Sequence, residues 1–166
     1  TVLELAGYHI DTSLYSEYMY EMGYGAARAV SENGEIELMI YDFGDQFIMY
    51  IAPCEAAEYP AAKVAAALDK IVKDTTVVLP EFFSSTYEIF EEDGYMIIYG
   101  DAFDDAVSNY ATTLYANGWV VDLDDFMCMA YSEDRTIELM IGIGFDDEGN
   151  TFFQIYAYAA EPLITS

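Results

Sequence analysis

The alternation of apolar and polar residues is clearest in a pentapeptide that occurs twice. Ile-Glu-Leu-Met-Ile stands at residues 36–40 and 137–141, and a Ser-Glu pair precedes both copies at the same offset of 101 residues. In each copy the two Ile and the Leu fall on one face, and Glu and Met fall on the other. Each copy is therefore predicted to be a β-strand with one apolar and one mixed face, and the spaced match indicates an internal duplication.

Helical spacing and turn signals divide the rest of the chain into further elements. In the first part they predict a strand at 2–6, a helix at 12–22 capped by Asp11 or Thr12, and strands at 26–30, 36–41 and 47–52. In the second part they predict a helix opened by Pro60, strands at 86–90 and 95–99, a helix opened by Asp101 or Asp104, and strands at 126–131, 137–143 and 152–159.

This order predicts an α+β fold made of two homologous helix-on-antiparallel-sheet units. The full unit, α-β-β-α-β-β-β, covers residues 59–166, and residues 1–58 form a truncated first copy, β-α-β-β-β. The duplication aligns Gly7 with Gly100, Gly23-Tyr24 with Gly118-Trp119, and Tyr50 with Tyr156. It also predicts equivalent buried positions on the apolar faces of the two pentapeptides: Ile36, Leu38 and Ile40, and Ile137, Leu139 and Ile141.

The charge balance narrows the classes of partner. There are 31 acidic and only 5 basic residues, a formal net charge of −26, although 54% of the residues are hydrophobic and can fill a core. Such a surface repels nucleic acid and anionic membranes, so neither is expected as a partner. The acidity itself has two explanations that stay open here, namely solubility or adaptation to salt, and a cationic partner or metal ion. No apolar run approaches the roughly 18 residues of a membrane-spanning helix.

A loose motif runs through the second unit: a helix opened by proline, a Leu-Pro connector, and a helix that ends in Tyr-x3-Leu-x3-Gly-aromatic. Its residues are Tyr59-Pro60, Leu79-Pro80, Tyr87, Gly100, Tyr110, Leu114 and Gly118-Trp119. The motif resembles an uncharacterised tandem domain of secreted proteins and lipoproteins of gut Firmicutes, in which Trp-Pro often replaces Tyr59-Pro60. The resemblance implies a bacterial, extracellular or cell-surface location, and it brings no activity, cofactor or catalytic residue. Because the chain begins at Thr1 and not at Met, we expect a processed or trimmed chain from which any targeting segment has been removed.

The residues that most often carry chemistry are sparse, and no catalytic residue is predicted. His9 is the single histidine and follows the first predicted strand, so it is expected to be a solvated turn residue. The sequence contains no nucleophile elbow of the Gly-x-Ser-x-Gly type. Cys54 and Cys128 are far apart, which favours free thiols, leaves a disulfide open, and does not support a zinc site.

No cofactor or metal site is predicted either, although calcium stays open because it needs only oxygen ligands. Asp122, Asp124 and Asp125 resemble the start of a calcium-binding loop, but Met127 stands where such a loop needs glycine. Gly142-x-Gly144 lies inside a predicted strand with no helix after it, which argues against a nucleotide site.

The most specific prediction concerns the mixed faces of the strands, which no predicted helix is left to cover. Tyr and Met are frequent there, and both are adaptable contact residues. The predicted partner-binding face comprises Glu37, Met39 and Tyr50 in the first unit and Glu138, Met140, Gln154, Tyr156 and Tyr158 in the second.

The sequence therefore favours a non-catalytic extracytoplasmic binding module with a protein or peptide partner, neutral or cationic. Two alternatives stay open: an acidic hydrolase with a carboxylate pair, and a self-assembling structural subunit that pairs through exposed edge strands. The oligomeric state is left open.

Overall fold

A computed structural model of the chain describes residues 2–12, 22–54, 57–124, 127–147 and 149–161. Its elements, in order, are α1 (Val2–Leu5), β1 (Tyr8–Asp11), β2 (Gly25–Ser31), β3 (Ile36–Asp42), β4 (Phe47–Pro53), α3 (Ala61–Ile71), β5 (Glu88–Glu92), β6 (Tyr95–Gly100), α4 (Ala106–Ala116), β7 (Val120–Leu123), β8 (Met127–Tyr131), β9 (Ile137–Phe145) and β10 (Thr151–Ala159).

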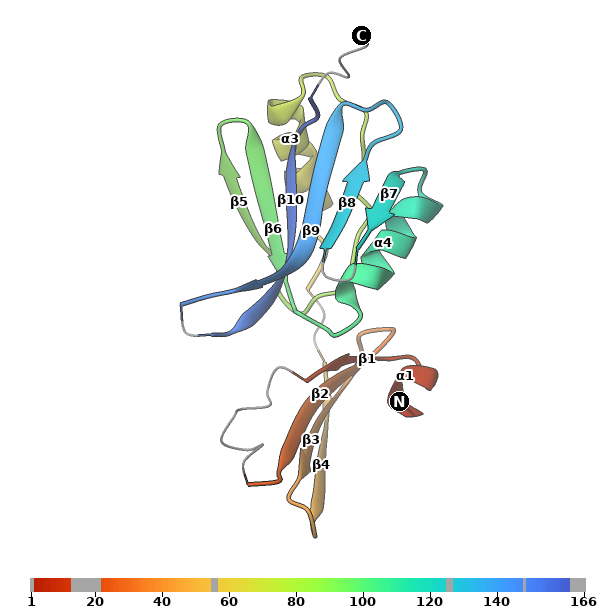
Figure 1. The fold of residues 1–166 in the computed structure, drawn as a ribbon, viewed down its shortest axis with the longest axis vertical. Helices are drawn as coiled ribbons and strands as arrows, with labels where there is room; N and C mark the ends of the chain where they lie inside the picture. The colour runs from red at the N-terminus through yellow and green to blue at the C-terminus, as the bar shows by residue number, and fades with distance from the viewer. Residues whose placement is uncertain (1, 13–21, 55–56, 125–126, 148, 162–166) are drawn as a thin grey trace.

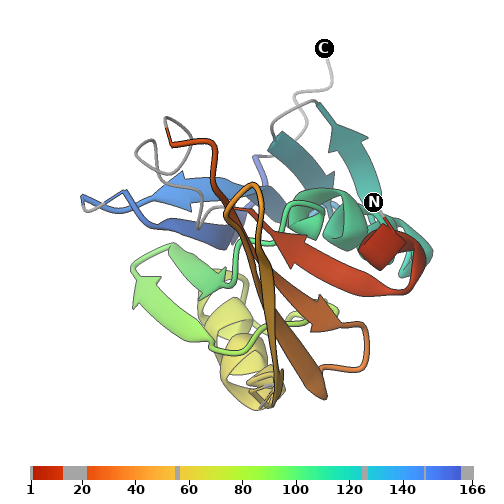
Figure 2. The same cartoon turned by 90° about the horizontal axis from the view of Figure 1, so that it is seen from below.

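The strands form two antiparallel sheets, which confirms the α+β prediction. A four-stranded sheet has the order β1-β2-β3-β4, and a six-stranded sheet has the order β5-β6-β10-β9-β8-β7. The two sheets lie end to end along the long axis of the molecule (Figure 1). Seen from below, the four-stranded sheet stands in the foreground, with the six-stranded sheet and its helices behind it (Figure 2).

The main core lies between one face of the six-stranded sheet and two helices. Helix α3 contacts β6 and β10, and helix α4 contacts β7, β8 and β9. The side chains of the second pentapeptide that point toward the helices are completely buried, as the alternation predicts. They are Ile137, Leu139 and Ile141, and the corresponding side chains of β10 are Phe153, Ile155 and Ala157.

The two copies of the pentapeptide occupy equivalent strands, β3 and β9. Met39 pairs with Tyr50 across β3 and β4, and Met140 pairs with Tyr156 across β9 and β10. Strand order and register are the same from β1 to β4 as from β7 to β10. The arrangement is what a duplication predicts, and it places Tyr50 and Tyr156 at equivalent positions.

The Ser-Glu match before each pentapeptide has a local structural reason. The Ser31 hydroxyl accepts a hydrogen bond from the Ile36 N–H at 3.0 Å, and the Ser132 hydroxyl accepts one from the Ile137 N–H at 3.0 Å. In both hairpins the serine therefore fastens the first residue of the following strand. A side chain that satisfies a backbone donor in a tight turn is a common reason for serine there.

The N-terminal prediction was wrong in two respects. Residues 2–6 do not form a strand, because Val2–Leu5 is a short helix, and the strands β1 and β7 were not predicted. Gly7 corresponds to Gly118 and not to Gly100: Gly7 and Gly118 follow helices with φ of +79° and +85°, whereas Gly100 ends strand β6. The predicted alignment of Gly23-Tyr24 with Gly118-Trp119 was therefore wrong as well. The helix predicted at 12–22 falls on residues 13–21, outside the described part of the chain.

The predicted burial of the first pentapeptide is only partly correct. Leu38 is buried against Ile10 and Ala29, and Leu3 of α1 packs on this small cluster. Ile36 is exposed, unlike Ile137 at the equivalent position. The difference arises because α3 and α4 cover only the six-stranded sheet.

Candidate functional site

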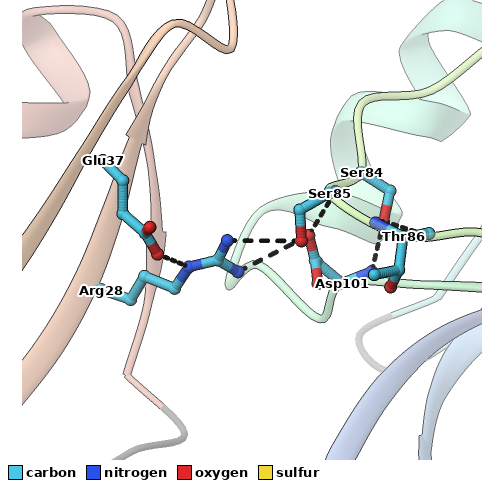
Figure 3. Close-up of polar contacts among 6 residues, drawn as sticks. All are labelled: Arg28, Glu37, Ser84, Ser85, Thr86 and Asp101. Carbon is cyan, nitrogen blue, oxygen red and sulfur yellow. Dashed lines mark hydrogen bonds and ion pairs between the residues drawn. The ribbon is translucent and has the colours of Figure 1, made fainter. Parts of the chain in front are cut away.

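The mixed face of the four-stranded sheet is directed at the second sheet through Arg28 of β2. The Arg28 Nε lies 2.5 Å from a Glu37 oxygen, and its Nη1 lies 3.5 Å from Asp101 Oδ2 (Figure 3). Its Nη2 also donates to the Ser85 hydroxyl at 3.4 Å, and the Ser85 N–H donates to Asp101 at 2.6 Å. Glu37 therefore belongs to a partly buried ion network between the sheets.

The sequence suggested that His9 is a solvated turn residue. It is instead a residue of strand β1 at the junction between the two sheets. Its ring stacks on Phe83 with centroids 5.8 Å apart and lies 5.6 Å from the ring of Phe103. Its Nδ1 lies 3.4 Å from Asp105 Oδ2. This hydrogen bond raises the pKa of His9 despite the opposing effect of burial, and it lowers the pKa of Asp105. The pair is a pH-sensitive contact between the two sheets.

Backbone contacts complete the junction. The Asp104 N–H donates to the Ile10 carbonyl oxygen at 2.7 Å, and the Thr12 hydroxyl donates to the Asp104 carboxylate at 3.1 Å. The segment between β6 and α4 is thus the part of the second unit that holds β1. Of the predicted binding residues in the first unit, Met39 is half-buried, and Tyr50 is exposed with its ring 6.1 Å from that of Tyr41.

The predicted residues of the second unit do come together, on the face of the six-stranded sheet opposite the helices. Tyr156 stacks on Tyr95 with centroids 4.8 Å apart and meets Tyr158 edge-on at 6.0 Å. All of these side chains are partly exposed. We call this surface the tyrosine face, and it comprises Tyr95, Met129, Tyr131, Glu138, Met140, Gln154, Tyr156 and Tyr158.

Two glutamates accept hydrogen bonds from three of the tyrosines on the tyrosine face. The Tyr95 hydroxyl donates to Glu92 at 2.8 Å, and this hydrogen bond raises the pKa of Tyr95 to about 12. Glu138 accepts hydrogen bonds from Tyr131 and Tyr158, and it raises the pKa of both phenols, with burial the larger cause for Tyr158. Three phenol hydroxyls of this face are therefore bonded to carboxylates, while their rings stay partly exposed.

One cation already lies on this face. The guanidinium carbon of Arg135, in the turn between β8 and β9, lies 5.0 Å from the centroid of the Tyr131 ring. A guanidinium over a tyrosine ring is attracted by the negative π-face. Arg135 therefore lies against the π-face of Tyr131 on the tyrosine face.

Sequence reasoning missed Tyr95, Met129, Tyr131 and Arg135. The signal for Tyr131 was present, because a short hairpin between β8 and β9 places it directly opposite Glu138. Tyr95 carried no local signal, since it joins the face only through the pairing of β6 with β10.

Other chemistry has little support among the described residues. A hollow of about 580 Å³ near the junction is lined by several carboxylates, of which Asp101 is ion-paired with Arg28. No group of three or more His, Cys, Asp or Glu side chains in the described ranges could hold a metal ion. Cys54 is half-buried and Cys128 is buried, and both are free thiols, in keeping with the sequence.

No described helix is both long enough and apolar enough to cross a membrane. Comparison of the chain with protein-family models, with curated proteins and with solved structures found no match.

Proposed function

We propose that this protein is a non-catalytic binding module whose tyrosine face binds a basic, extended segment of another protein or peptide. The observation that carries the proposal is the group of ordered, half-exposed rings on the open side of the six-stranded sheet, one of which already holds a guanidinium.

The chemistry of the face favours arginine-containing partners. Rings whose hydroxyls are fixed by Glu92 and Glu138 lose little conformational freedom on binding, which lowers the cost of forming a complex. Tyr and Met supply contact area, while the glutamates and the net charge of −26 attract cations. Each ring that stacks on a guanidinium contributes about 0.5–1 kcal/mol at an exposed site.

The test must separate this face from general attraction to an acidic protein. Fluorescently labelled peptides that alternate arginine with leucine, and matched lysine peptides, are titrated with the protein at several salt concentrations. The double variant Tyr156→Ala, Tyr158→Ala keeps the net charge, so non-specific attraction stays the same. We expect it to weaken arginine-peptide binding roughly 5- to 30-fold, since two ring contacts are lost.

The matched control removes two exposed aromatic rings elsewhere, in Tyr115→Ala, Phe145→Ala. It should bind like the parent protein. Equal binding by the parent and the Tyr156/Tyr158 variant would show that charge alone attracts the peptide and would overturn the proposal. Unfolding of the Tyr156/Tyr158 variant would show that these rings belong to the structural core.

We further propose that the protein works outside the cytoplasm of a bacterium. The support is the resemblance of the second unit to a domain of secreted proteins and lipoproteins. Detection of the native protein in the cytosolic fraction alone would contradict this location.

A further inference from the structure

In the described part of the chain, the apolar face of the four-stranded sheet is covered by α1 only around Leu38 and is exposed along β4. On β4, Phe47 is 64% exposed and Ile51 is 70% exposed. The equivalent residues of β10, by register with the two pentapeptides, are Phe153 and Ala157, which are 1% and 0% exposed. The same pattern of side chains is thus a closed core in one sheet and an open surface in the other.

The second sheet shows what closes such a face. Phe153 lies beneath α4 and the connector after α3, with ring centroids 5.9 Å from Tyr110 and 5.0 Å from Phe82. The outer edge of β10 is paired with β6, whereas β4 is the last strand of its sheet in the described part of the chain. An apolar face beside a free strand edge is the kind of surface that proteins normally cover.

Helix α1 indicates which segment would cover this apolar face. Its hydrogen bonds are the same as those in the last turn of α4. In α1 the Ala6 N–H donates to the carbonyl oxygens of Val2 and Leu3 at 3.1 and 3.0 Å. In α4 the Asn117 N–H donates to Thr113 and Leu114 at 3.1 and 3.0 Å. Each turn is followed by a glycine of positive φ and then by a strand of the matching sheet.

We propose that this apolar face and the free edge of β4 are a docking surface for an α–β–β–α segment like residues 61–116, supplied by a longer polypeptide that enters α1 from its N-terminal side. The second strand of that segment pairs with β4, as β6 pairs with β10. Its second helix ends in α1 and covers β3, as α4 covers β9, and its first helix covers β4, as α3 covers β10. Together the two helices cover the exposed apolar side chains of this face. These side chains are Ile36, Phe47, Met49 and Ile51.

A second copy of the chain fits this surface less well. The α3–β5–β6–α4 segment of each copy already fills its own six-stranded sheet, so lending it to a neighbour would uncover a larger core. A segment continuous with α1 needs no such exchange, because the helix it completes is already in register with β1.

The experiment adds an α–β–β–α segment to the N-terminal side of α1. Residues 57–112 are duplicated directly before Val2 in the full chain, so that the added helix runs into α1 in the register of α4 and β7. Hydrogen exchange is measured at the outward-facing amides of β4, together with binding of an apolar fluorescent dye. We expect slower exchange of those amides by at least about tenfold and loss of most dye binding, because the edge becomes paired and the face covered.

Ile51→Glu gives the sharper comparison. In the 166-residue chain Ile51 is exposed, so the melting temperature should change by less than about 2 °C. In the extended chain the same carboxylate would be buried, and the melting temperature should fall by more than about 5 °C. Ile48→Glu, on the opposite face of β4, is the matched control and should have the same effect in both chains.

Three results would overturn the proposal. The first is unchanged exchange and dye binding in the extended chain, whether or not the added segment is structured. The second is an equal effect of Ile51→Glu in both chains. The third is protection of the β4 amides in the 166-residue chain as its concentration rises, with a doubled mass by light scattering, since the occupant would then be a second copy.

Discussion

His9 connects protonation to the packing of the two sheets. Its hydrogen bond with Asp105 raises its pKa in the folded state, with Glu32 adding a smaller effect of the same sign. The stabilisation is therefore complete below the unfolded value of about 6.5 and is lost as the pH rises through the higher folded value. We expect the melting temperature to fall as the pH rises from about 6.5 through the higher folded pKa of His9.

The variant His9→Gln tests whether this pH dependence of the melting temperature comes from His9. In His9→Gln the part of the pH dependence that comes from this ion pair should disappear, and Asp105→Asn should remove it as well. Because His9 is the single histidine, its ring protons can be followed directly by NMR during a pH titration. A midpoint at or below the usual value would contradict the assignment of the pair.

The two pentapeptides offer a matched comparison of the same residue in two environments. Ile137 is completely buried, whereas Ile36 at the equivalent position is 39% exposed. Ile137→Ala should therefore lower the free energy of unfolding by about 2–5 kcal/mol, and Ile36→Ala by less than about 1 kcal/mol. Denaturant titration of both variants measures the difference, and equal losses would show that the face of β3 is covered in solution.

At the scale of elements, strands were predicted best where the alternation of apolar and polar residues was longest. The alternation at 36–40 and 137–141 predicted both strands and their apolar faces. Asn33-Gly34, a dipeptide typical of tight turns, lies in the hairpin between β2 and β3. The short run at 2–6 was misjudged, since four or five apolar residues fit a strand and a helical turn equally well. Gly7, which follows this run, was the better sign of a helix end, because it occupies the position that Gly118 occupies after α4.

The contacts at the junction between the two sheets could not be predicted from local sequence patterns. His9 meets Phe83, Phe103 and Asp105, which lie far away in the sequence on the other unit. Alternation correctly put Glu37 on the mixed face of β3, but it could not show that this face is turned toward the second sheet. For the tyrosine face the same alternation grouped the residues of β9 and β10, because the helices lie on the other side of that sheet. It could not include Tyr95, which joins the face only through the pairing of β6 with β10.

For the molecule as a whole, charge repulsion should dominate the response to salt. With 31 acidic and 5 basic residues, most carboxylates repel one another, although Arg28 and Lys70 form ion pairs. Since salt screens exposed charges over about 10 Å at 0.1 M, we expect the melting temperature to rise between about 0.01 and 1 M sodium chloride. Calorimetry measures this, and a flat response would mean that the repulsion is too diffuse to matter. A rise with micromolar calcium at constant ionic strength would instead reveal a specific metal site.

The different strand orders of the two sheets also set the order in which they can fold. Every pair in the four-stranded sheet joins strands that follow one another in the chain, so hairpin closure alone can build it. The six-stranded sheet must bring β10 back to β6 across α4 and three strands, and closing so long a loop is slower. As the chain leaves the ribosome, the N-terminal sheet is therefore expected to form early. Arg28 can then pair at once with Glu37 of the same sheet. Its contact with Asp101 and the contact of His9 with Asp105 form only when the second unit folds, after the last strand has been made.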